Sequence, residues 1–455
     1  MAEQMMQHKA DELAAKQTIP AGYKQTEVGV IPEDWKVDPL GVLINQIEYG
    51  SSAKSSSRGR VPVLRMGNLQ DGQIDWGDLV YTNNDYEISK YELNDGDLLF
   101  NRTNSIDLVG KTALYKGIKK AIFAGYLIRI KVDPQCLDAR YLNYFLNTPT
   151  ARKYGLSVVS VGVSQANING QKLKSYPIPY PAHVEEQVSI ATALSDTDAL
   201  ITGLEQLIAK KQAIKTASMQ QLLTGRTRLP QFARGPDGAP KSYKSSELGQ
   251  IPEDWDVVCA GDLGKFRGGN GFPVIEQGKL NGEYPFYKVS DMNNEGNDVY
   301  MSASNNWISK EDQSRIGSFV FPSGCIVFAK VGAAVFLERK KILSMPSCID
   351  NNMAALELNI AKCDVNFVYH FLQSIRFGDF VSTTALPSLN ASVLSKIKII
   401  MPLIKEQTAI ATILSDMDNE LQALTQKLAK ARDVKQGMMQ QLLTGRIRLP
   451  LPQEA

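Results

Sequence analysis

The chain repeats part of its own sequence at a constant offset of 220 residues. The pentapeptide Ile-Pro-Glu-Asp-Trp at 31–35 returns at 251–255, and 24 of 44 positions are identical without a gap between 187–230 and 407–450. The stretches between these repeated parts barely resemble each other. Two similar frames therefore carry two dissimilar inserts, a pattern that suits a protein that reads two different things at a fixed separation.

Length and composition predict an intracellular protein with more than one domain. A chain of 455 residues should form two or more domains. No apolar run approaches the roughly 18 residues of a membrane span, and residues 1–17 are polar, so we expect neither a membrane anchor nor a secretory signal. The cysteines show no C-x-x-C pair, which favours reduced thiols in the cytoplasm over a disulfide framework or a zinc site. They are Cys136, Cys259, Cys325, Cys348 and Cys363.

Each insert is predicted to mix strands with one or two helices. The runs 97–100, 126–132 and 325–329 are apolar and are bounded by Gly, Asn, Asp and Ser, as strands between turns are. Helices are expected at 139–146 and 366–375. The chain therefore belongs to the α+β class, and its Gly- and Pro-rich segment 230–240 is typical of a flexible linker.

A long helix is predicted to close each repeat. About 40 residues at 1.5 Å per residue correspond to a rod of roughly 60 Å, and Gly225 and Gly445 stand where a helix end favours a left-handed residue. Apolar residues recur at spacings of four and three, the pattern of a coiled-coil seam. We expect this helix-pair seam to contain Leu194, Ile201, Leu204 and Ile208 of the first helix and Leu414, Leu421, Leu424 and Leu428 of the second.

The charges along both helices are polarised. Each helix carries mainly acidic residues in its first half and mainly basic residues in its second half. This order suits the helix dipole, and it also means that an antiparallel pair would set acidic halves against basic halves. We therefore predict an intramolecular antiparallel pair with pseudo-twofold symmetry. The alternative is that each helix packs independently on its own domain.

The order of these segments resembles the specificity (S) subunits of type I restriction–modification systems. The resemblance rests on two variable inserts, two helices that end Met-Gln-Gln-Leu-Leu-Thr-Gly-Arg-x-Arg-Leu-Pro, and the leader Ile-Pro-Glu-Asp-Trp, all at the 220-residue period. It covers residues 23–450. The resemblance implies that each insert is a target-recognition domain that contacts one half of a bipartite sequence in double-stranded DNA. It also implies that the helices hold the two domains apart and dock two modification (M) subunits.

The resemblance further implies the roles of the partner subunits. S-adenosylmethionine would be used by the M subunits, and ATP and Mg by restriction (R) subunits that join through the complex. The chain itself would hold no cofactor or metal. The domain boundaries expected on this basis are an N-terminal extension at 1–21, target-recognition domain 1 at 22–182, spacer helix 1 at 183–229, a linker at 230–242, target-recognition domain 2 at 243–402, spacer helix 2 at 403–450 and a tail at 451–455.

Candidate DNA-contacting residues lie in polar loops of both inserts. Such side chains suit phosphate oxygens and base edges, since Arg pairs with guanine and Asn or Gln with adenine. A solvated polar loop without a binding role explains each segment at least as well. The candidates are Lys54, Ser57, Arg58, Arg60, Arg102, Asn104, Gln165 and Asn167 in the first insert, and Lys265, Arg267, Asn270, Lys330, Thr383 and Thr384 in the second.

Two repeated features have both a structural and a functional interpretation. The paired arginines at 226 and 228, and at 446 and 448, suit phosphate or M-subunit contacts, but they also compensate a helix C-terminus. Trp35 and Trp255 are expected to anchor the core rather than to stack on bases.

No catalytic constellation is recognisable in the sequence. The run Val-Gly-Lys-Thr at 109–112 lacks the glycine that a phosphate-binding loop requires at position 105, where Ser105 stands. We find no amino-methyltransferase motif and no nuclease motif. We therefore predict a non-catalytic DNA-recognition subunit. The alternatives are a fused restriction–methylation enzyme and a coiled-coil scaffold whose inserts bind protein.

Overall fold

The chain divides into two compact units. The computed structural model describes residues 19–162, 165–381 and 387–450. Unit 1 comprises residues 1–203 and 428–455, and unit 2 comprises residues 204–427.

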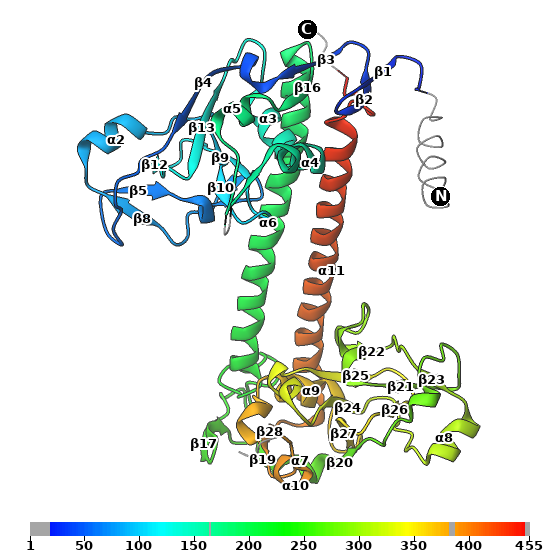
Figure 1. Ribbon diagram of the computed structural model, residues 1–455. Coiled ribbons are helices and arrows are strands. Elements are labelled where there is room, and N and C mark those ends of the chain that lie inside the picture. Colours follow the sequence, from blue (N-terminus) through cyan, green and yellow to red (C-terminus); the bar gives the residue numbers. More distant parts are fainter. Residues whose placement is uncertain (1–18, 163–164, 382–386, 451–455) are drawn as a thin grey trace. The chain divides into compact units, whose positions relative to one another are not determined.

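The two long helices, α6 (Val184–Leu222) and α11 (Ile404–Leu442), each begin in one unit and end in the other (Figure 1). Each unit therefore combines one insert with the start of the helix that follows it and the end of the other long helix. The structural units are thus offset from the sequence repeats.

The insert of unit 1 is built on a four-stranded antiparallel sheet with the order β11–β9–β13–β4. A second sheet, β12–β5–β8, joins its first two strands in parallel and its last two antiparallel. Two-residue strands form a β10–β15–β14 sheet and a β6–β7 hairpin, and β16 pairs with β3. The elements are β1 (Tyr23–Thr26), β2 (Gly29–Pro32), β3 (Trp35–Pro39), β4 (Ile44–Tyr49), β5 (Val61–Leu64), β6 (Leu69–Gln70), β7 (Gln73–Ile74), β8 (Val80–Thr82), α2 (Asp85–Tyr91), β9 (Leu98–Asn101), β10 (Thr103–Asn104), β11 (Thr112–Leu114), β12 (Ile122–Phe123), β13 (Leu127–Val132), α3 (Ala139–Leu146), α4 (Pro149–Val158), β14 (Ser160–Val161), β15 (Ala166–Asn167), α5 (Gly170–Lys174) and β16 (Pro177–Pro181).

The insert of unit 2 is built on a five-stranded sheet with the order β20–β27–β24–β25–β22. Its second sheet, β23–β21–β26, has one antiparallel and one parallel pairing, and β19 pairs with β28. The elements are β17 (Tyr243–Ser246), β18 (Gly249–Pro252), β19 (Asp256–Cys259), α7 (Ala260–Leu263), β20 (Gly264–Gly268), η3 (Val274–Glu276), β21 (Tyr284–Tyr287), η4 (Val289–Asn293), β22 (Tyr300–Met301), β23 (Trp307–Ile308), α8 (Lys310–Ile316), β24 (Ile326–Ala329), η5 (Ala333–Leu337), β25 (Lys340–Leu343), β26 (Cys348–Ile349), β27 (Met353–Leu358), α9 (Val365–Gln373), η6 (Phe377–Phe380), α10 (Ala391–Leu394) and β28 (Lys398–Met401).

The two inserts share one topology despite their unlike sequences. The strand order β25–β24–β27–β20 in unit 2 repeats the order β11–β9–β13–β4 in unit 1, with every pairing antiparallel. The smaller sheets also match, because each contains one parallel pair next to one antiparallel pair. The inserts are therefore dissimilar in sequence and in detail, but not in the arrangement of their strands.

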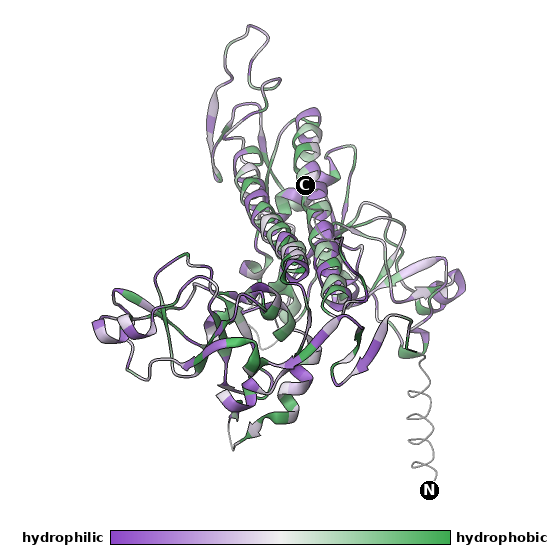
Figure 2. Cartoon of the chain, turned by 90° about the horizontal axis from the view of Figure 1, so that it is seen from above, coloured by the Kyte–Doolittle hydropathy of each residue, from purple (hydrophilic) through white to green (hydrophobic). Residues whose placement is uncertain are grey.

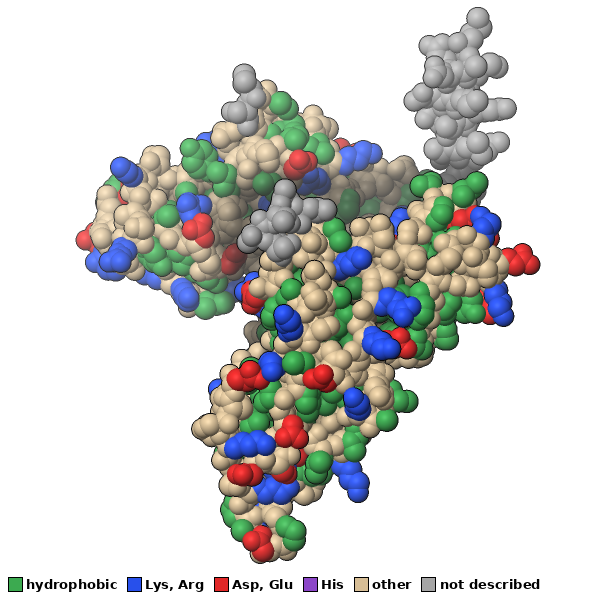
Figure 3. Space-filling view, turned by 90° about the horizontal axis from the view of Figure 1, so that it is seen from below, with side chains coloured by type: hydrophobic (Ala, Val, Ile, Leu, Met, Phe, Trp, Pro, Cys, Tyr) green, Lys and Arg blue, Asp and Glu red, His purple; other side chains and the backbone are tan. Residues whose placement is uncertain are grey.

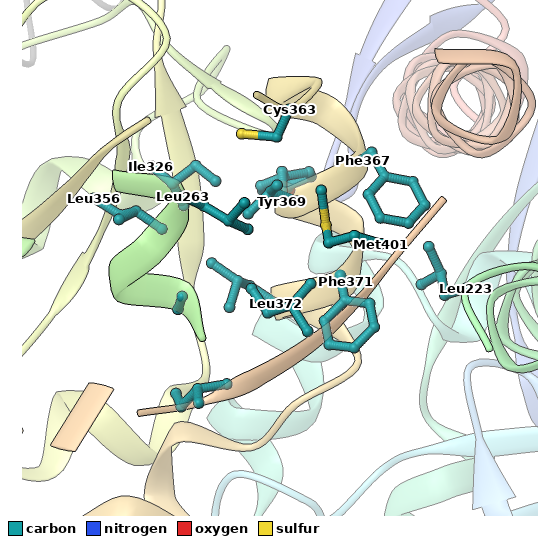
Figure 4. Packing of buried hydrophobic residues seen from close by; sticks show 14 of the residues in the cluster. Leu223, Leu263, Ile326, Leu356, Cys363, Phe367, Tyr369, Phe371, Leu372 and Met401 are labelled. Atoms are coloured by element: carbon teal, nitrogen blue, oxygen red, sulfur yellow. The ribbon is translucent and has the colours of Figure 1, made fainter. Parts of the chain in front are cut away.

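The core of each unit joins its insert to both long helices. In unit 2, α9 packs Phe367, Tyr369, Phe371 and Leu372 among residues of the sheet, and Leu223 from the end of α6 reaches the same cluster (Figure 4). In unit 1, the corresponding cluster includes the start of α6 and Leu442 and Leu443 at the end of α11. Trp35 and Trp255 are 1% and 0% exposed, so the prediction that they anchor the core is confirmed.

The two long helices contact each other inside both units through pairs of opposite charge. In unit 2, Lys211 and Lys215 of α6 pair with Glu420 and Asp418 of α11. In unit 1, Asp198 of α6 pairs with Lys435 of α11 at 2.5 Å. In unit 2, residue numbers rise along α6 as they fall along α11, which is the order of an antiparallel contact. In each unit, a basic residue from the second half of one helix pairs with an acidic residue from the first half of the other.

The predicted seam residues lie on the less exposed side of these helices. Leu194, Leu414 and Leu424 are buried, and the other five are half-buried. By contrast, Leu200 on α6 is 56% exposed. Figure 2 shows that hydrophilic and hydrophobic residues share both helices.

Several sequence-based boundaries differ from the observed ones by one or two residues. The helix at 139–146 is found as predicted, whereas the helix predicted at 366–375 spans Val365–Gln373. Gly225 and Gly445 have φ angles of 71° and 66°, so both adopt the left-handed conformation expected near a helix end. The linker at 230–240 folds into a turn in which the Gly235 amide donates to the Ala239 carbonyl at 2.9 Å.

Candidate nucleic-acid interface

Arg102 directly follows β9, a central strand of the main sheet in unit 1, and therefore lies where the carboxyl end of that strand leaves the sheet. Its Nε donates to the Gly125 carbonyl at 3.0 Å, and its guanidinium lies 4.8 Å from the centre of the Tyr49 ring at the end of β4. The side chain is half-buried, and its terminal nitrogens have no carboxylate partner among the described residues. A guanidinium held in this way retains the two-pronged donor geometry that recognises phosphate or guanine.

Three further predicted residues are brought to Arg102 by a small sheet. The strand β10 carries Asn104 and pairs with β15, which carries Asn167, and Gln165 lies exposed directly before β15. The Asn167 amide donates to the Thr103 hydroxyl at 2.6 Å, while its oxygen keeps acceptor capacity. The structure therefore assembles these side chains from two segments more than 60 residues apart in the chain.

The remaining candidates of unit 1 lie on the long loop between β4 and β5. Lys54, Ser57, Arg58 and Arg60 are all exposed. Arg60 is paired with Asp85, so its charge is already partly balanced. The loop starts close to Arg102, and Gly125 connects the two. The Gly125 carbonyl accepts from Arg102 Nε, and the Gly125 amide donates to the carbonyl of Ser51, at the start of the loop, at 2.7 Å.

In unit 2, the candidates gather along β20. Lys265 and Arg267 are exposed on this strand, and the Arg267 guanidinium stacks 3.8 Å from the centre of the Phe319 ring. Asn270 accepts from the Phe319 amide at 3.0 Å and donates to the Gly317 carbonyl. The Asn270 side chain thus holds a loop in place, which explains its presence without a base contact. Thr383 and Thr384 lie outside the described residues.

Lys330 occupies in unit 2 the place that Arg102 occupies in unit 1. Lys330 follows β24 and accepts a backbone bond from Leu389, just as Arg102 follows β9 and accepts one from Ile168. The sequences around the two cations are unrelated, and only the shared topology shows that Arg102 and Lys330 are equivalent.

The backbone beside each cation approaches a neighbouring segment so closely that only glycine fits. A Cβ at Gly50 would lie 2.4 Å from the Phe123 carbonyl oxygen, and one at Gly269 would lie 2.2 Å from the Ile349 carbonyl oxygen. Gly50 follows β4 and Gly269 follows β20, which are equivalent strands. The same close approach therefore shapes the same corner of both inserts.

Asn169 and Asn390, which occupy matching places before the last strand of each insert, are helix caps. Each caps a short helix, because the Asn169 side chain accepts from the Lys172 amide and the Asn390 side chain accepts from the Ser392 amide. Two further basic residues of the second insert, Arg339 and Arg376, were not among the candidates predicted from the sequence. Arg339 stands between Glu338 and Lys340 and Arg376 between Ile375 and Phe377, so neither has an adjacent Gly, Asn, Asp or Pro to mark a turn.

The repeated arginines near the helix ends form ion-pair clusters, one around a buried arginine in unit 2 and one around an exposed arginine in unit 1. In unit 2, Arg228 bonds Asp254 at 2.8 Å and Glu406 at 2.5 Å, and its side chain is only 4% exposed. In unit 1, Arg448 bonds Asp34 at 3.0 Å together with Glu186. Each arginine links the end of one long helix to a leader and to the start of the other helix. The phosphate-contact interpretation is therefore wrong for Arg228, while Arg226 and Arg446 remain exposed.

A second repeated contact couples each insert to the helices through different side chains. In unit 1, the Tyr144 hydroxyl of α3 donates to Asp198 at 2.7 Å. In unit 2, the equivalent residue of α9 is His370, whose Nδ1 lies 3.8 Å from Asp418 while Nε2 bonds the Ser415 hydroxyl at 3.1 Å. Burial lowers the pKa of His370 to about 4, although the Asp418 carboxylate acts in the opposite direction.

The surface of the molecule shows no single basic patch on the face drawn in Figure 3, where Lys and Arg side chains are interspersed with Asp and Glu. Within the described residues, no group of three or more His, Cys, Asp or Glu side chains is arranged to hold a metal ion. In that same part of the chain, no helix is long and apolar enough to cross a membrane.

Comparisons with known proteins agree on one family. The profile described as type I restriction modification DNA specificity domain matches twice, at residues 32–216 and 252–431. A relative from Methanocaldococcus jannaschii that bears the name of the MjaX type I restriction enzyme specificity subunit is 29% identical, over 94% of this chain and 97% of its own length. The MjaVIII specificity subunit from the same organism is 26% identical, over 92% of this chain and 94% of its own length.

A solved structure shares the fold. The crystal structure of an S subunit of a type I restriction-modification system from M. genitalium matches with a TM-score of 0.59 at 16% identity, over 90% of this chain and 96% of that chain.

Proposed function

The chain belongs to the type I restriction–modification DNA specificity family, and we propose that it reads a bipartite DNA sequence through its two inserts. It is a non-catalytic specificity subunit, which recognises the DNA sequence for a type I restriction–modification complex. The proposed target-recognition domains are residues 22–182 and 243–402, hereafter the first and second recognition domains.

The observation that carries this proposal is one topology with two different sets of polar side chains. Both recognition domains place a cation after the central strand, Arg102 in the first and Lys330 in the second. In the first domain, Asn104 and Asn167 lie on the small sheet next to Arg102. In the second domain, the residues near Lys330 are Arg267 and the Phe319 ring on which it stacks. A common scaffold with different donors and acceptors suits two readers of different half-sites, because base identity is read through donor and acceptor patterns.

We propose that α6 and α11 form an antiparallel coiled-coil spacer with pseudo-twofold symmetry. The support comes from contacts that recur at the 220-residue offset: Lys215 with Asp418 recurs as Lys435 with Asp198. The Tyr243 hydroxyl donates to the Gly225 carbonyl at 2.9 Å, and the Tyr23 hydroxyl donates to the Gly445 carbonyl at 3.0 Å. Such a frame would offer two equivalent surfaces to two M subunits.

The partner subunits would carry the chemistry. In the proposed complex, the M subunits bind S-adenosylmethionine and methylate adenine, and R subunits use ATP and Mg to translocate and cleave DNA. Mass measurement of the complex purified with its M subunit tests the stoichiometry. Two M subunits for each copy of this chain are expected, and a saturated complex with one M subunit would contradict the proposal.

The test of the bipartite reading is methylation mapping in cells that express the chain with its M subunit. Replacing residues 40–175 with the corresponding insert of another family member is expected to change one half-site and preserve the other. If both half-sites change together, the two domains do not read separately. If the M subunit methylates the same sites without this chain, the chain is a scaffold and not a reader.

A further inference from the structure

The segment 330–340 of the second recognition domain, hereafter the clasped loop, displays two large apolar side chains between two cations. Phe336 and Leu337 are 54% and 57% exposed. Lys330 begins the loop and Arg339 stands near its end, and in the described chain neither has a carboxylate within ion-pair distance. The adjacent Val274 and Ile275 of the same insert are more exposed, at 84% each, so what distinguishes the pair Phe336 and Leu337 is the presence of a large aromatic ring and of two flanking cations.

A buried ion pair fixes the base of the clasped loop. Lys340 is 1% exposed, and its Nζ donates to Glu338 at 2.8 Å and to the Ile375 carbonyl at 3.0 Å. The Glu338 carboxylate accepts in turn from the backbone amides of Phe377 and Gly378, each at 2.8 Å. These bonds tie the loop to η6, so the apolar pair does not depend on its own packing for its position.

The backbone of the clasped loop is strained where it presents the apolar pair. Glu338 adopts a φ of 54°, which costs a residue other than glycine roughly 1 kcal/mol or more. The Phe336 ring rests on Gly378, where an added Cβ would lie 3.0 Å from the ring. One side of the ring is thus supported by the η6 backbone while most of the rest is open. Such a conformation persists because the surrounding structure fixes it, here through the bonds of Glu338 to the amides of Phe377 and Gly378.

We propose that Phe336 and Leu337 form an apolar wedge that enters a base step of duplex DNA in the second half-site, while Lys330 and Arg339 contact the flanking phosphates. Apolar side chains inserted between base pairs unstack and kink the duplex, and neighbouring cations offset the charge of the phosphates. This inference rests on the proposed DNA-reading function. The flanking cations favour DNA over an apolar protein partner as the occupant of this surface.

The first recognition domain carries a weaker counterpart after its own central strand. Ile106 and Leu108 are 41% and 40% exposed in the loop that follows Arg102. The Asn101 side chain donates to the Leu108 carbonyl at 3.1 Å and holds this loop in place of a buried ion pair. Because these side chains are aliphatic and less exposed, the wedge is assigned to the second domain.

The experiment uses the complete complex with its M subunit and a duplex that carries the mapped methylation target. A 2-aminopurine replaces each adenine of the second half-site in turn, since its fluorescence rises when a base unstacks. The wild-type complex is expected to raise the fluorescence at one step. The double variant Phe336→Ala, Leu337→Ala should lose this rise and bind the target at least about tenfold more weakly. Ile360→Ala, at a 77% exposed apolar site outside the loop, is the matched control.

Three results overturn the wedge. The first is unchanged fluorescence and affinity in the double variant, and the second is an equal loss of affinity for unrelated DNA. The third is loss of the M subunit from the purified complex, which would make this surface a protein contact. Absence of target selectivity in the wild-type complex would instead contradict the proposed function itself. Phe336→Leu, which keeps an apolar side chain, is expected to retain part of the fluorescence change.

Discussion

The first and second recognition domains place a cation at the same corner of the same sheet, yet they support it with unlike neighbours. Arg102 is held by the Gly125 carbonyl and the Tyr49 ring, whereas in the second domain Arg267 stacks on Phe319 near Gly268 and Lys330. The comparison teaches that the arrangement of strands fixes where the cation stands. The side chains around that place differ between the two domains, as they would in a reader of two different half-sites.

The contacts that join each domain to the helices show the opposite behaviour. Arg228 with Asp254 and Glu406 has its counterpart 220 residues away along the chain, and the residue types are the same. The repeated part of the sequence is thus used for intramolecular contacts. The two clusters differ in the exposure of the arginine side chain, which is 4% for Arg228 and 41% for Arg448.

The largest effect is expected from the two arginine clusters. Arg228→Ala would leave the buried Glu406 carboxylate without its charged partner and with only the bond from Trp255 Nε1, and the loss of one partner of a buried pair costs about 3–5 kcal/mol. Arg448 is 41% exposed, so water that takes its place can solvate the otherwise buried Glu186, and Arg448→Ala should cost less, about 1–3 kcal/mol. Urea unfolding of both variants measures the difference. Equal losses would show that the two clusters are energetically alike despite their unequal exposure.

The second prediction concerns pH and distinguishes His370 from Tyr144. Burial lowers the pKa of His370 from 6.5 to about 4, so the unfolded chain takes up a proton first as the pH falls. Stability should therefore decrease from about pH 6.5 down to about pH 4, by at most roughly 3 kcal/mol. The neighbouring groups are Asp418 and Ser415 of α11 and Lys215 of α6.

Replacement by tyrosine, the residue of the first domain, tests this assignment. His370→Tyr is expected to flatten the stability profile between pH 4 and 6.5, because tyrosine stays neutral in that range. Thermal unfolding across the range measures it. A profile with the same slope in the variant would assign the pH dependence to other groups.

The third prediction concerns the two equivalent cations. Arg102→Ala should relax the sequence requirement of one half-site at a cost of about 1–3 kcal/mol in target binding, because a guanidinium can read guanine. Lys330→Ala, which removes a phosphate contact, should weaken target binding about equally for all sequences and leave the other half-site unchanged in sequence. Methylation mapping and binding measurements with each variant report the two outcomes. A uniform loss of binding with an unchanged sequence requirement in Arg102→Ala would mean that Arg102 contacts phosphates only.

The smallest expected effect is a difference in stability between variants of the two core tryptophans. The Trp255 Nε1 donates to the Glu406 carboxylate at 3.1 Å, whereas the buried Trp35 Nε1 has no partner among the described residues. Hydrogen bonds to charged groups contribute about 1.5–3 kcal/mol. Trp255→Phe should therefore be more destabilising than Trp35→Phe by roughly 1.5 kcal/mol in urea unfolding. A larger loss for Trp35→Phe would reverse the comparison.

The sequence by itself determined the frame of this protein. The 220-residue repeat, the periodic leucines and the polarised charges predicted two inserts and two long helices, because hydrophobic period and charge order are local properties of the chain. The central strand before Arg102 and the burial of Trp35 and Trp255 could be predicted for the same reason.

Only the tertiary structure decided which residues share a site. It made Arg102 and Lys330 equivalent, placed Asn167 next to Thr103, assigned Arg228 to a buried ion pair and exposed Phe336 beside the strained Glu338. None of these features can be predicted from the residues next to it in the sequence, since each depends on strands and loops that are distant along the chain. The free energy of such contacts comes from burial and from pairing of charges, and both are defined only once the chain has folded.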